Sequence, residues 1–172
     1  KKNIFAASIH FEHIIPADEE EAAAIICYEI FLRYYVEGLR YANSPYAFHT
    51  VGSAMACSYE AYIKTEGMNK RKAAEDFYFL EKLAKNFTVE NISSAVVYPS
   101  SRGSWRVPFG TGQRVNRFLS KAQNEYLLYN PDSFLILKEW LNIFETANDS
   151  EKLLTSAKKI HYSLYEYLSS QN

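Results

Sequence analysis

The chain of 172 residues is long enough for one domain with a sizeable hydrophobic core. Its 19 Lys and Arg against 20 Asp and Glu leave a net charge of -1, which gives no sign of a nucleic-acid or anionic-membrane surface. There is no apolar run of membrane length and no signal-peptide pattern, and Cys27 and Cys57 lack the spacing of a metal site, so we expect a cytoplasmic protein without a membrane span.

The N-terminal part predicts a strand and a long helix. Residues 4–11 are an apolar run typical of a buried strand, and because the sequence opens so abruptly, without a Met, we expect a segment of a longer protein. A proline and the acidic residues 18–21 predict the start of a helix that extends to about Arg40. Glu29 and Arg33 lie one turn apart on its apolar stripe, where we predict a partly buried ion pair, with substrate contact as the alternative. The stripe consists of Ala22, Ile25, Ile26, Leu32, Val36 and Leu39.

A second strand is predicted after the helix breaks at residues 43–45. This strand covers residues 46–56 and carries His49 and the small pair Gly52 and Ser53. Small side chains let a ligand approach the backbone closely, but tight packing between strands explains them equally well. His49 is either a hydrogen-bonded structural residue or a ligand contact.

The centre of the chain predicts two helices joined by a turn. Residues 58–65 have the pattern of a short helix, and residues 66–67 form the turn. Asn69 then predicts the N-terminal cap of the second helix, which extends to about Lys85. On a helical period Asp76 shares the apolar face of this helix with Ala73, Leu80 and Leu83.

The position of Asp76 needs an explanation. A carboxylate on an apolar face costs several kcal/mol, roughly, unless it is paired or its pKa shifts. A structural ion pair or a cap to a neighbouring loop accounts for such a residue, and a catalytic carboxylate is the alternative. The spacing alone favours the structural explanation.

A third strand and a cationic loop follow this helix. Residues 89–98 predict a strand with residues 95–97 as its buried centre. The loop 100–114 contains three arginines and three glycines, so it can present guanidinium forks and backbone N–H groups to a phosphate or diphosphate. Alternatively, it is a surface loop whose arginines pair with acids such as Glu75.

The C-terminal third predicts helices without recognisable chemistry. One helical pattern starts near Gln113, the next follows Asp132, and the last runs from Ser150 towards the end of the chain. Asp132 and Ser150 are the predicted N-caps of the last two helices. We interpret these helices as packing or partner surface.

Three short motifs occur in order along the chain. These are Gly52-Ser53-Ala54-Met55-Ala56, Gly67-Met68-Asn69 and Glu75-Asp76-Phe77-Tyr78-Phe79-Leu80. The ordered set resembles the acceptor-side half of the family 2 glycosyltransferases, which have the GT-A fold. The resemblance covers about residues 46–112 and includes one small departure, Glu66 where the family often has Gly. The family's N-terminal nucleotide-binding half has no counterpart here, since the chain contains no Asp-x-Asp motif.

The resemblance implies an inverting transfer of a sugar from a nucleotide-sugar donor to an acceptor hydroxyl. Asp76 would be the general base, with Glu75 as its catalytic neighbour. His49 could alternatively meet a diphosphate-bound metal, and a divalent cation, Mg or Mn, is expected only in the intact enzyme. The family's Gln-x-x-Arg-Trp order is not reproduced, but two arginines of the loop would lie near the leaving group. The implied substrate-binding residues are His49, Gly52, Ser53, Arg102 and Arg106.

We therefore expect a mostly helical α/β fold. Residues 1–125 would form a partial GT-A-like sheet of a few strands with packed helices, and residues 126–172 a helical extension. The segment should be inactive alone and, because sheet edges and apolar helix faces stay uncovered, should form a homodimer or pack its tail into the gap. The rival interpretation is a non-catalytic helical domain that binds a protein or a carbohydrate, in which Asp76 forms a structural pair.

Overall fold

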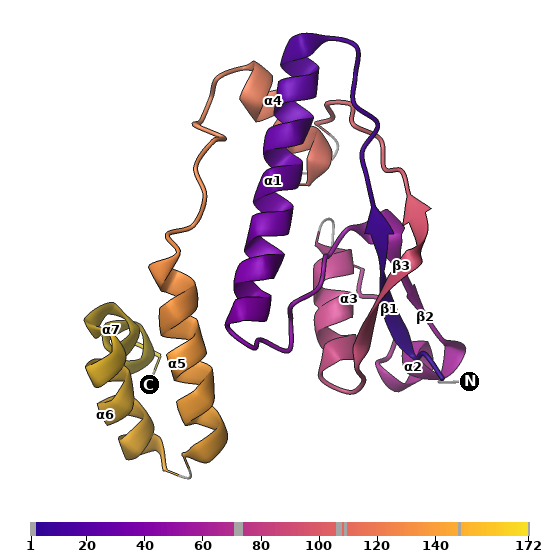
Figure 1. Ribbon diagram of the computed structural model, residues 1–172. Helices are drawn as coiled ribbons and strands as arrows, with labels where there is room; N and C mark the ends of the chain where they lie inside the picture. The colour runs from indigo at the N-terminus through magenta and orange to yellow at the C-terminus, as the bar shows by residue number, and fades with distance from the viewer. Residues whose placement is uncertain (1–2, 71–73, 106–107, 109, 148, 172) are drawn as a thin grey trace. The chain divides into compact units, whose positions relative to one another are not determined.

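The chain forms two compact units. The computed structural model describes residues 3–70, 74–105, 108, 110–147 and 149–171. Unit 1 comprises Lys1–Tyr34 and Phe48–Leu127, and unit 2 comprises Tyr35–Ala47 and Leu128–Asn172. Helix α1 (Glu19–Tyr41) passes from the first unit into the second (Figure 1). None of the described helices is both long and apolar enough to cross a membrane.

A mixed sheet of three strands, in the order β2-β1-β3, forms the centre of unit 1. β1 (Ala6–Phe11) pairs antiparallel with β2 (Met55–Cys57) and parallel with β3 (Val89–Val97). The register of β1 against β3 shifts after Ile9, where residues 93–95 of β3 bulge out of the ladder. The strands predicted over residues 4–11 and 89–98 are thereby confirmed.

Two predictions about the strands are wrong. Only Met55–Cys57 of the second strand pairs with a neighbour, while Gly52–Ala54 forms a 3₁₀ turn, η1. Gly and Ser have low strand propensity, and the pattern of small residues marked a turn instead. The centre of β3 is exposed rather than buried: Ala95 is exposed and Val96 is 40% exposed, because the bulge turns this part of the strand outwards.

Three shorter helices complete unit 1: α2 (Tyr59–Lys64), α3 (Glu75–Ala84) and α4 (Thr111–Leu119). α2 is confirmed, and the Ser58 side chain accepts a hydrogen bond from the N–H of Ala61 as its N-cap. The predicted start of the next helix at Asn69 is wrong, since α3 begins at Glu75. Its N-cap is Ala74, which has a left-handed backbone with φ 58°.

The core of unit 1 explains how α3 is held. Leu80 and Leu83 are fully buried and Phe79 is nearly so, in one cluster with Ala6 of β1. Figure 1 shows α3 beside the sheet. A second cluster joins α1 to α4 through Ala24, Ile25 and Val115. Ile26, which the apolar stripe of α1 included, is instead 44% exposed.

Unit 2 consists of the end of α1 with α5 (Asp132–Thr146), α6 (Ser150–Ile160) and α7 (Tyr162–Ser169). The ring of Phe134 packs directly on Gly38, which leaves no room for a side chain there. Three predictions at the helix ends are wrong. Pro131 precedes α5 as its N-cap in place of Asp132, Asp149 caps α6 in place of Ser150, and the extended backbone of His161 divides the last helix in two.

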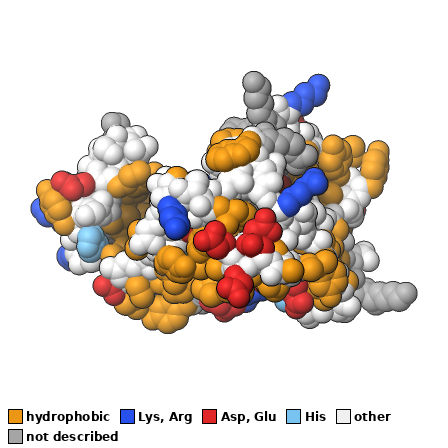
Figure 2. All heavy atoms as spheres, turned by 90° about the horizontal axis from the view of Figure 1, so that it is seen from above, with side chains coloured by type: hydrophobic (Ala, Val, Ile, Leu, Met, Phe, Trp, Pro, Cys, Tyr) orange, Lys and Arg blue, Asp and Glu red, His pale blue; other side chains and the backbone are white. Residues whose placement is uncertain are grey.

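Acidic residues at the start of α1 lie at the positive end of the helix dipole. The first turn of α1 contains Glu19, Glu20 and Glu21. Negative charge near a helix N-terminus is stabilising, and we assign these three side chains to helix stability. Figure 2 shows acidic side chains on the face seen from above.

Candidate functional site

A cavity of about 390 Å³ opens in unit 1 at the first turns of α3 and α4. It contains four of the residues predicted for the site, although η1 and α3 bring them there from separate segments of the chain. The wall of the cavity includes Tyr28, Gly52, Ser53, Glu75, Asp76 and Thr111. A small polar ligand in this cavity can meet the carboxylates of Glu75 and Asp76.

Asp76 is half-buried at the wall of this cavity. Its Oδ1 accepts a hydrogen bond of 2.7 Å from the N–H of Phe77, and the carboxylate also accepts from the N–H of Gly52. Burial raises the pKa of Asp76, these two N–H groups lower it, the nearby charge of Glu75 raises it, and the net shift is upwards. A carboxylate with a raised pKa that faces a cavity is suited to accept a proton from a bound ligand.

Position 52 accommodates only a glycine because the Asp76 carboxylate lies against it. A Cβ atom at position 52 would stand 2.7 Å from Oδ2 of Asp76, well inside contact distance. The glycine lets the carboxylate approach the η1 backbone and receive its N–H. The sequence left open whether this glycine serves a ligand or packing, and the close approach of Asp76 is the immediate reason for it. Ser53 is exposed beside it on the cavity wall.

The remaining predicted substrate residues lie elsewhere. The ring of His49 packs edge-on against the ring of Phe11, with 5.1 Å between the ring centroids. The backbone carbonyl of His49 accepts a hydrogen bond of 2.9 Å from the Ser8 hydroxyl. Neither His49 nor the exposed Arg102 belongs to the described residues that line the cavity. Arg106 lies outside the described residues.

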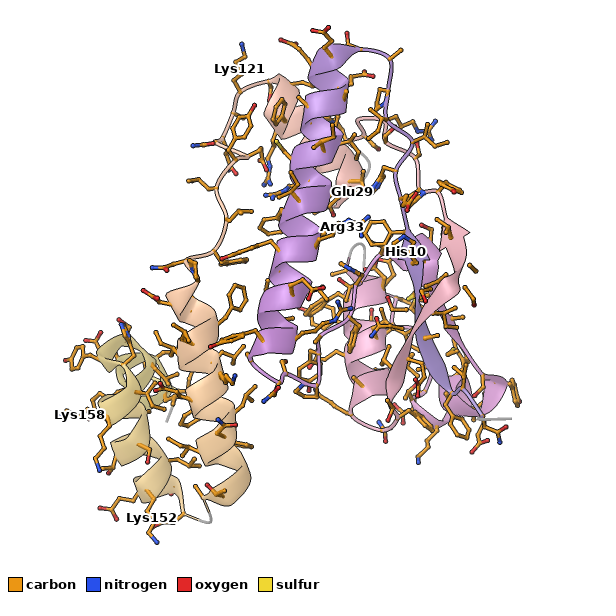
Figure 3. The ribbon with its side chains drawn as sticks, in the orientation of Figure 1. His10, Glu29, Arg33, Lys121, Lys152 and Lys158 are labelled. Carbon is orange, nitrogen blue, oxygen red and sulfur yellow. The ribbon has the colours of Figure 1, made fainter. Side chains whose placement is uncertain are left out.

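The predicted Glu29–Arg33 pair is confirmed. Arg33 Nη2 donates to Glu29 Oε2 at 2.7 Å and to the carbonyl of Phe11 at 3.0 Å. Figure 3 shows both side chains leaving α1 on the side of β1. The ion pair therefore ties α1 to the end of the strand.

The second carboxylate oxygen of Glu29 contacts His13, a partner that the sequence did not predict. Its Oε1 accepts from the backbone N–H of His13 at 2.6 Å and lies 2.8 Å from His13 Nδ1. His13 is 5% exposed, and its Nε2 lies 3.3 Å from Oγ1 of Thr111, which also hydrogen-bonds the phenol of Tyr28. Thr111 and Tyr28 both line the cavity. This polar chain, Glu29–His13–Thr111–Tyr28, joins residues up to 98 positions apart, and only Glu29 stood out in the sequence.

Burial and partners shift two pKa values in the polar chain. Burial acts to raise the pKa of Glu29, but the hydrogen bonds from His13 and Arg33 outweigh it, so the pKa is lowered. Burial raises the pKa of the Tyr28 phenol, against the lowering effects of Arg114 and Thr111, and the charge of Asp76 raises it further. Glu29 is therefore an anion at neutral pH, and Tyr28 keeps its proton.

A buried carboxylate fixes α4, which carries Thr111. Glu125 has a side chain only 5% exposed and lies 2.8 Å from Arg114 Nη1 and 2.8 Å from Arg117 Nε. The Arg114 guanidinium also covers the ring of Phe31 at 4.2 Å. Arg114, the last arginine of the predicted cationic loop, is thus engaged in holding α4.

In the described part of the chain, no group of three or more His, Cys, Asp and Glu side chains is placed to hold a metal ion. Comparison of the sequence and structure with protein-family models, curated proteins and solved structures returns no match.

Proposed function

We propose that this chain is the acceptor-side half of a family 2 glycosyltransferase, in which a sugar passes from a nucleotide-sugar donor to an acceptor hydroxyl. The observation that carries the proposal is Asp76, a half-buried carboxylate with a raised pKa at the wall of a cavity of about 390 Å³. Gly52 and Ser53 of the first motif line the same cavity. Motifs that the resemblance pairs in sequence thus share one site.

The proposed reaction is a single displacement. The Asp76 carboxylate takes the proton of the acceptor hydroxyl, whose oxygen forms a bond to the anomeric carbon as the bond to the donor's diphosphate oxygen breaks. The electron pair of that bond leaves with the nucleotide diphosphate, and the anomeric configuration inverts. General-base assistance of this kind contributes roughly 10²- to 10⁴-fold to a rate.

The other roles follow from the resemblance. Arg102 and Arg106 are assigned to the charge of the leaving diphosphate, and Glu75 to the support of Asp76. A divalent cation, Mg or Mn, would belong to the donor side of the intact enzyme. We place the intact enzyme in the cytoplasm and expect this segment to be inactive alone, with homodimerisation covering its exposed edges.

A second candidate is a non-catalytic domain that binds a carbohydrate or a protein. Exposed aromatic side chains favour it, because tyrosine rings provide stacking surface for sugars and partners. Tyr59 is 82% exposed, Tyr126 69% and Tyr167 63%. In this case Asp76 would contribute to stability and binding without accepting a proton.

The test compares this chain with a version extended N-terminally through its gene. Nucleotide-sugar binding is measured by calorimetry with Mg²⁺ or Mn²⁺, and turnover by release of nucleotide diphosphate. Asp76→Asn should lower the turnover of the extended protein at least about 100-fold while nucleotide-sugar affinity stays the same. Glu81→Gln, on the same helix and paired with Lys85, is the matched control and should leave turnover unchanged. If the extended protein binds no nucleotide sugar and Asp76→Asn alters only stability, the transferase proposal fails and the binding domain takes its place.

A further inference from the structure

A second, smaller cavity of about 230 Å³ lies at the C-terminal end of α4 in unit 1. Two aromatic rings form part of its wall, Phe118 of α4 and Tyr126 of the segment that follows, with ring centroids 5.5 Å apart at an angle of 60°. Lys121, which also lines this cavity, marks its place in Figure 3. The volume is below the range of about 300–1,000 Å³ that is common for drug-sized ligands, so the cavity suits a ligand about as large as one sugar ring.

The ring of Tyr126 is 69% exposed, yet the chain on both sides of it is anchored. The backbone N–H of Tyr126 donates a hydrogen bond of 3.1 Å to Oδ1 of Asn124. Its neighbour Glu125 is the buried carboxylate that pairs with Arg114 and Arg117 of α4. A ring that the fold already positions loses little conformational entropy when a ligand stacks on it.

The polar residues of this cavity match the groups of a sugar. Gln123 and Asn124 are exposed at its wall, and an amide side chain has both donors and an acceptor for hydroxyl groups. The apolar C–H face of a pyranose packs on an aromatic ring, while the hydroxyl groups at its edge form hydrogen bonds with amides. An anchored aromatic ring beside two amides therefore fits a sugar unit.

Helix α4 links this cavity to the cavity at Asp76. Thr111 in the first turn of α4 lines the larger cavity, and Phe118 near the end of the helix lines the smaller one. At about 1.5 Å per residue the two positions lie about 10 Å apart along the helix axis. A single pyranose ring is shorter than this distance, so a ligand that reaches both cavities must contain more than one sugar unit.

We propose that the cavity at Tyr126 is a subsite for a remote sugar unit of the acceptor, and that the acceptor is therefore an oligosaccharide. The inference rests on the proposed function and names the class of its acceptor. The reacting sugar unit lies at Asp76, and a unit further along the oligosaccharide stacks on Tyr126. The second contact adds affinity because it is intramolecular once the first contact has formed.

The experiment titrates this chain with oligosaccharides of increasing length. The probes are the cello-, malto-, manno- and chito-oligosaccharides, each from the monosaccharide to the tetrasaccharide, and NMR measures the dissociation constants. In at least one series the tetrasaccharide should bind about tenfold more tightly than the monosaccharide, since it gains the contact with Tyr126. The backbone signal of Gly52 and the side-chain amide signal of Asn124 should both shift, with one common dissociation constant, because one ligand reaches both cavities.

Variants at Tyr126 separate stacking from folding. Tyr126→Ala should weaken tetrasaccharide binding about tenfold and leave the monosaccharide affinity, measured at the Gly52 signal, unchanged. Tyr126→Phe keeps the ring and should retain the tetrasaccharide affinity. Tyr59→Ala, which removes the 82% exposed tyrosine of α2, is the matched control and should change neither affinity.

The outcomes distinguish this inference from the proposed function. The inference is overturned if no oligosaccharide binds more tightly than its monosaccharide, if Tyr126→Ala leaves the tetrasaccharide affinity unchanged, or if the two signals report different dissociation constants. The proposed function then still stands on the nucleotide-sugar binding and turnover of the extended protein. Conversely, an extended protein without turnover, in which tetrasaccharide binding still depends on Tyr126, would overturn the transferase and keep the oligosaccharide site.

Discussion

Two carboxylates of unit 1 are both withdrawn from water, yet their pKa values move in opposite directions. Asp76 at the start of α3 receives hydrogen bonds from backbone N–H groups and lies beside the like charge of Glu75, so burial prevails and its pKa rises. Glu29 in α1 receives hydrogen bonds from His13 and Arg33, and its pKa falls. Partners rather than burial decide the outcome. Glu29 is committed to the fold, whereas Asp76 retains an affinity for protons at the cavity.

The comparison predicts the largest loss of stability at Glu29. Glu29→Gln removes the charge that faces Arg33 and His13 and leaves an N–H group where an acceptor is needed, so unfolding free energy should fall by about 2–4 kcal/mol. Urea denaturation measures the change. The control is Glu81→Gln, whose pair with Lys85 is largely exposed and should cost no more than about 0.5 kcal/mol. Equal losses at the two sites would contradict the distinction.

A smaller change at Gly52 should sharpen the description of Asp76. In Gly52→Ala the new Cβ would stand 2.7 Å from Asp76 Oδ2 and push the carboxylate away from the Gly52 N–H. We expect a loss of about 1–2 kcal/mol and a further rise in the pKa of Asp76, because a hydrogen bond that lowers this pKa is lost. Carbon-13 NMR of the carboxyl group measures the pKa. Ser53→Ala next to it should change neither quantity, and an unaltered pKa in Gly52→Ala would argue against the contact.

The start of α3 offers a gain in stability. Ala74 has φ 58°, which is unfavourable for a residue with a Cβ. Ala74→Gly should therefore raise the unfolding free energy by about 0.5–1 kcal/mol, after the greater freedom of glycine in the unfolded chain is counted. Ala84→Gly at the other end of α3 lacks this strain and should destabilise the chain instead. Thermal unfolding that lowers stability in both variants would rule out relief of strain.

Local patterns predicted what depends on neighbours in sequence. Helical spacing identified α1 and the Glu29–Arg33 pair, and the pattern of residues 58–65 identified α2. The N-cap preference of asparagine placed a helix start at Asn69, but α3 begins after Ala74, whose left-handed backbone no residue preference indicates. The strand predicted over residues 46–56 also overlooked the low strand propensity of Gly52 and Ser53, which form the turn η1.

The candidate site divides in the same way. The ordered motifs brought Gly52, Ser53, Glu75 and Asp76 to attention, and these four residues do share a cavity. His13 and Thr111 had no signal, because their importance lies in a contact across 98 positions of sequence. Hydrogen-bond partners of buried polar groups are set by tertiary structure, so periodicity cannot reveal them.

The pH dependence of stability is the most delicate test of the two carboxylates. Because the pKa of Asp76 is raised in the folded chain, the unfolded chain loses this proton first as pH rises above the ordinary value of about 3.9. Stability from this group therefore falls between that pH and the raised pKa, and stays low above it. Asp76→Asn should gain stability relative to the wild type across this window and hold the gain at higher pH.

Glu29 should show the reverse behaviour. Its favourable contribution is complete above the ordinary glutamate pKa of about 4.3 and is lost as pH falls through the lowered value, so the deficit of Glu29→Gln should shrink in acid. Urea titrations of both variants between about pH 3 and about pH 7 measure the two differences. Differences that change with pH in the same direction would mean that one carboxylate has been assigned the wrong partners. Opposite changes would support Asp76 as the carboxylate with the raised affinity for a proton. A base at the cavity requires this property.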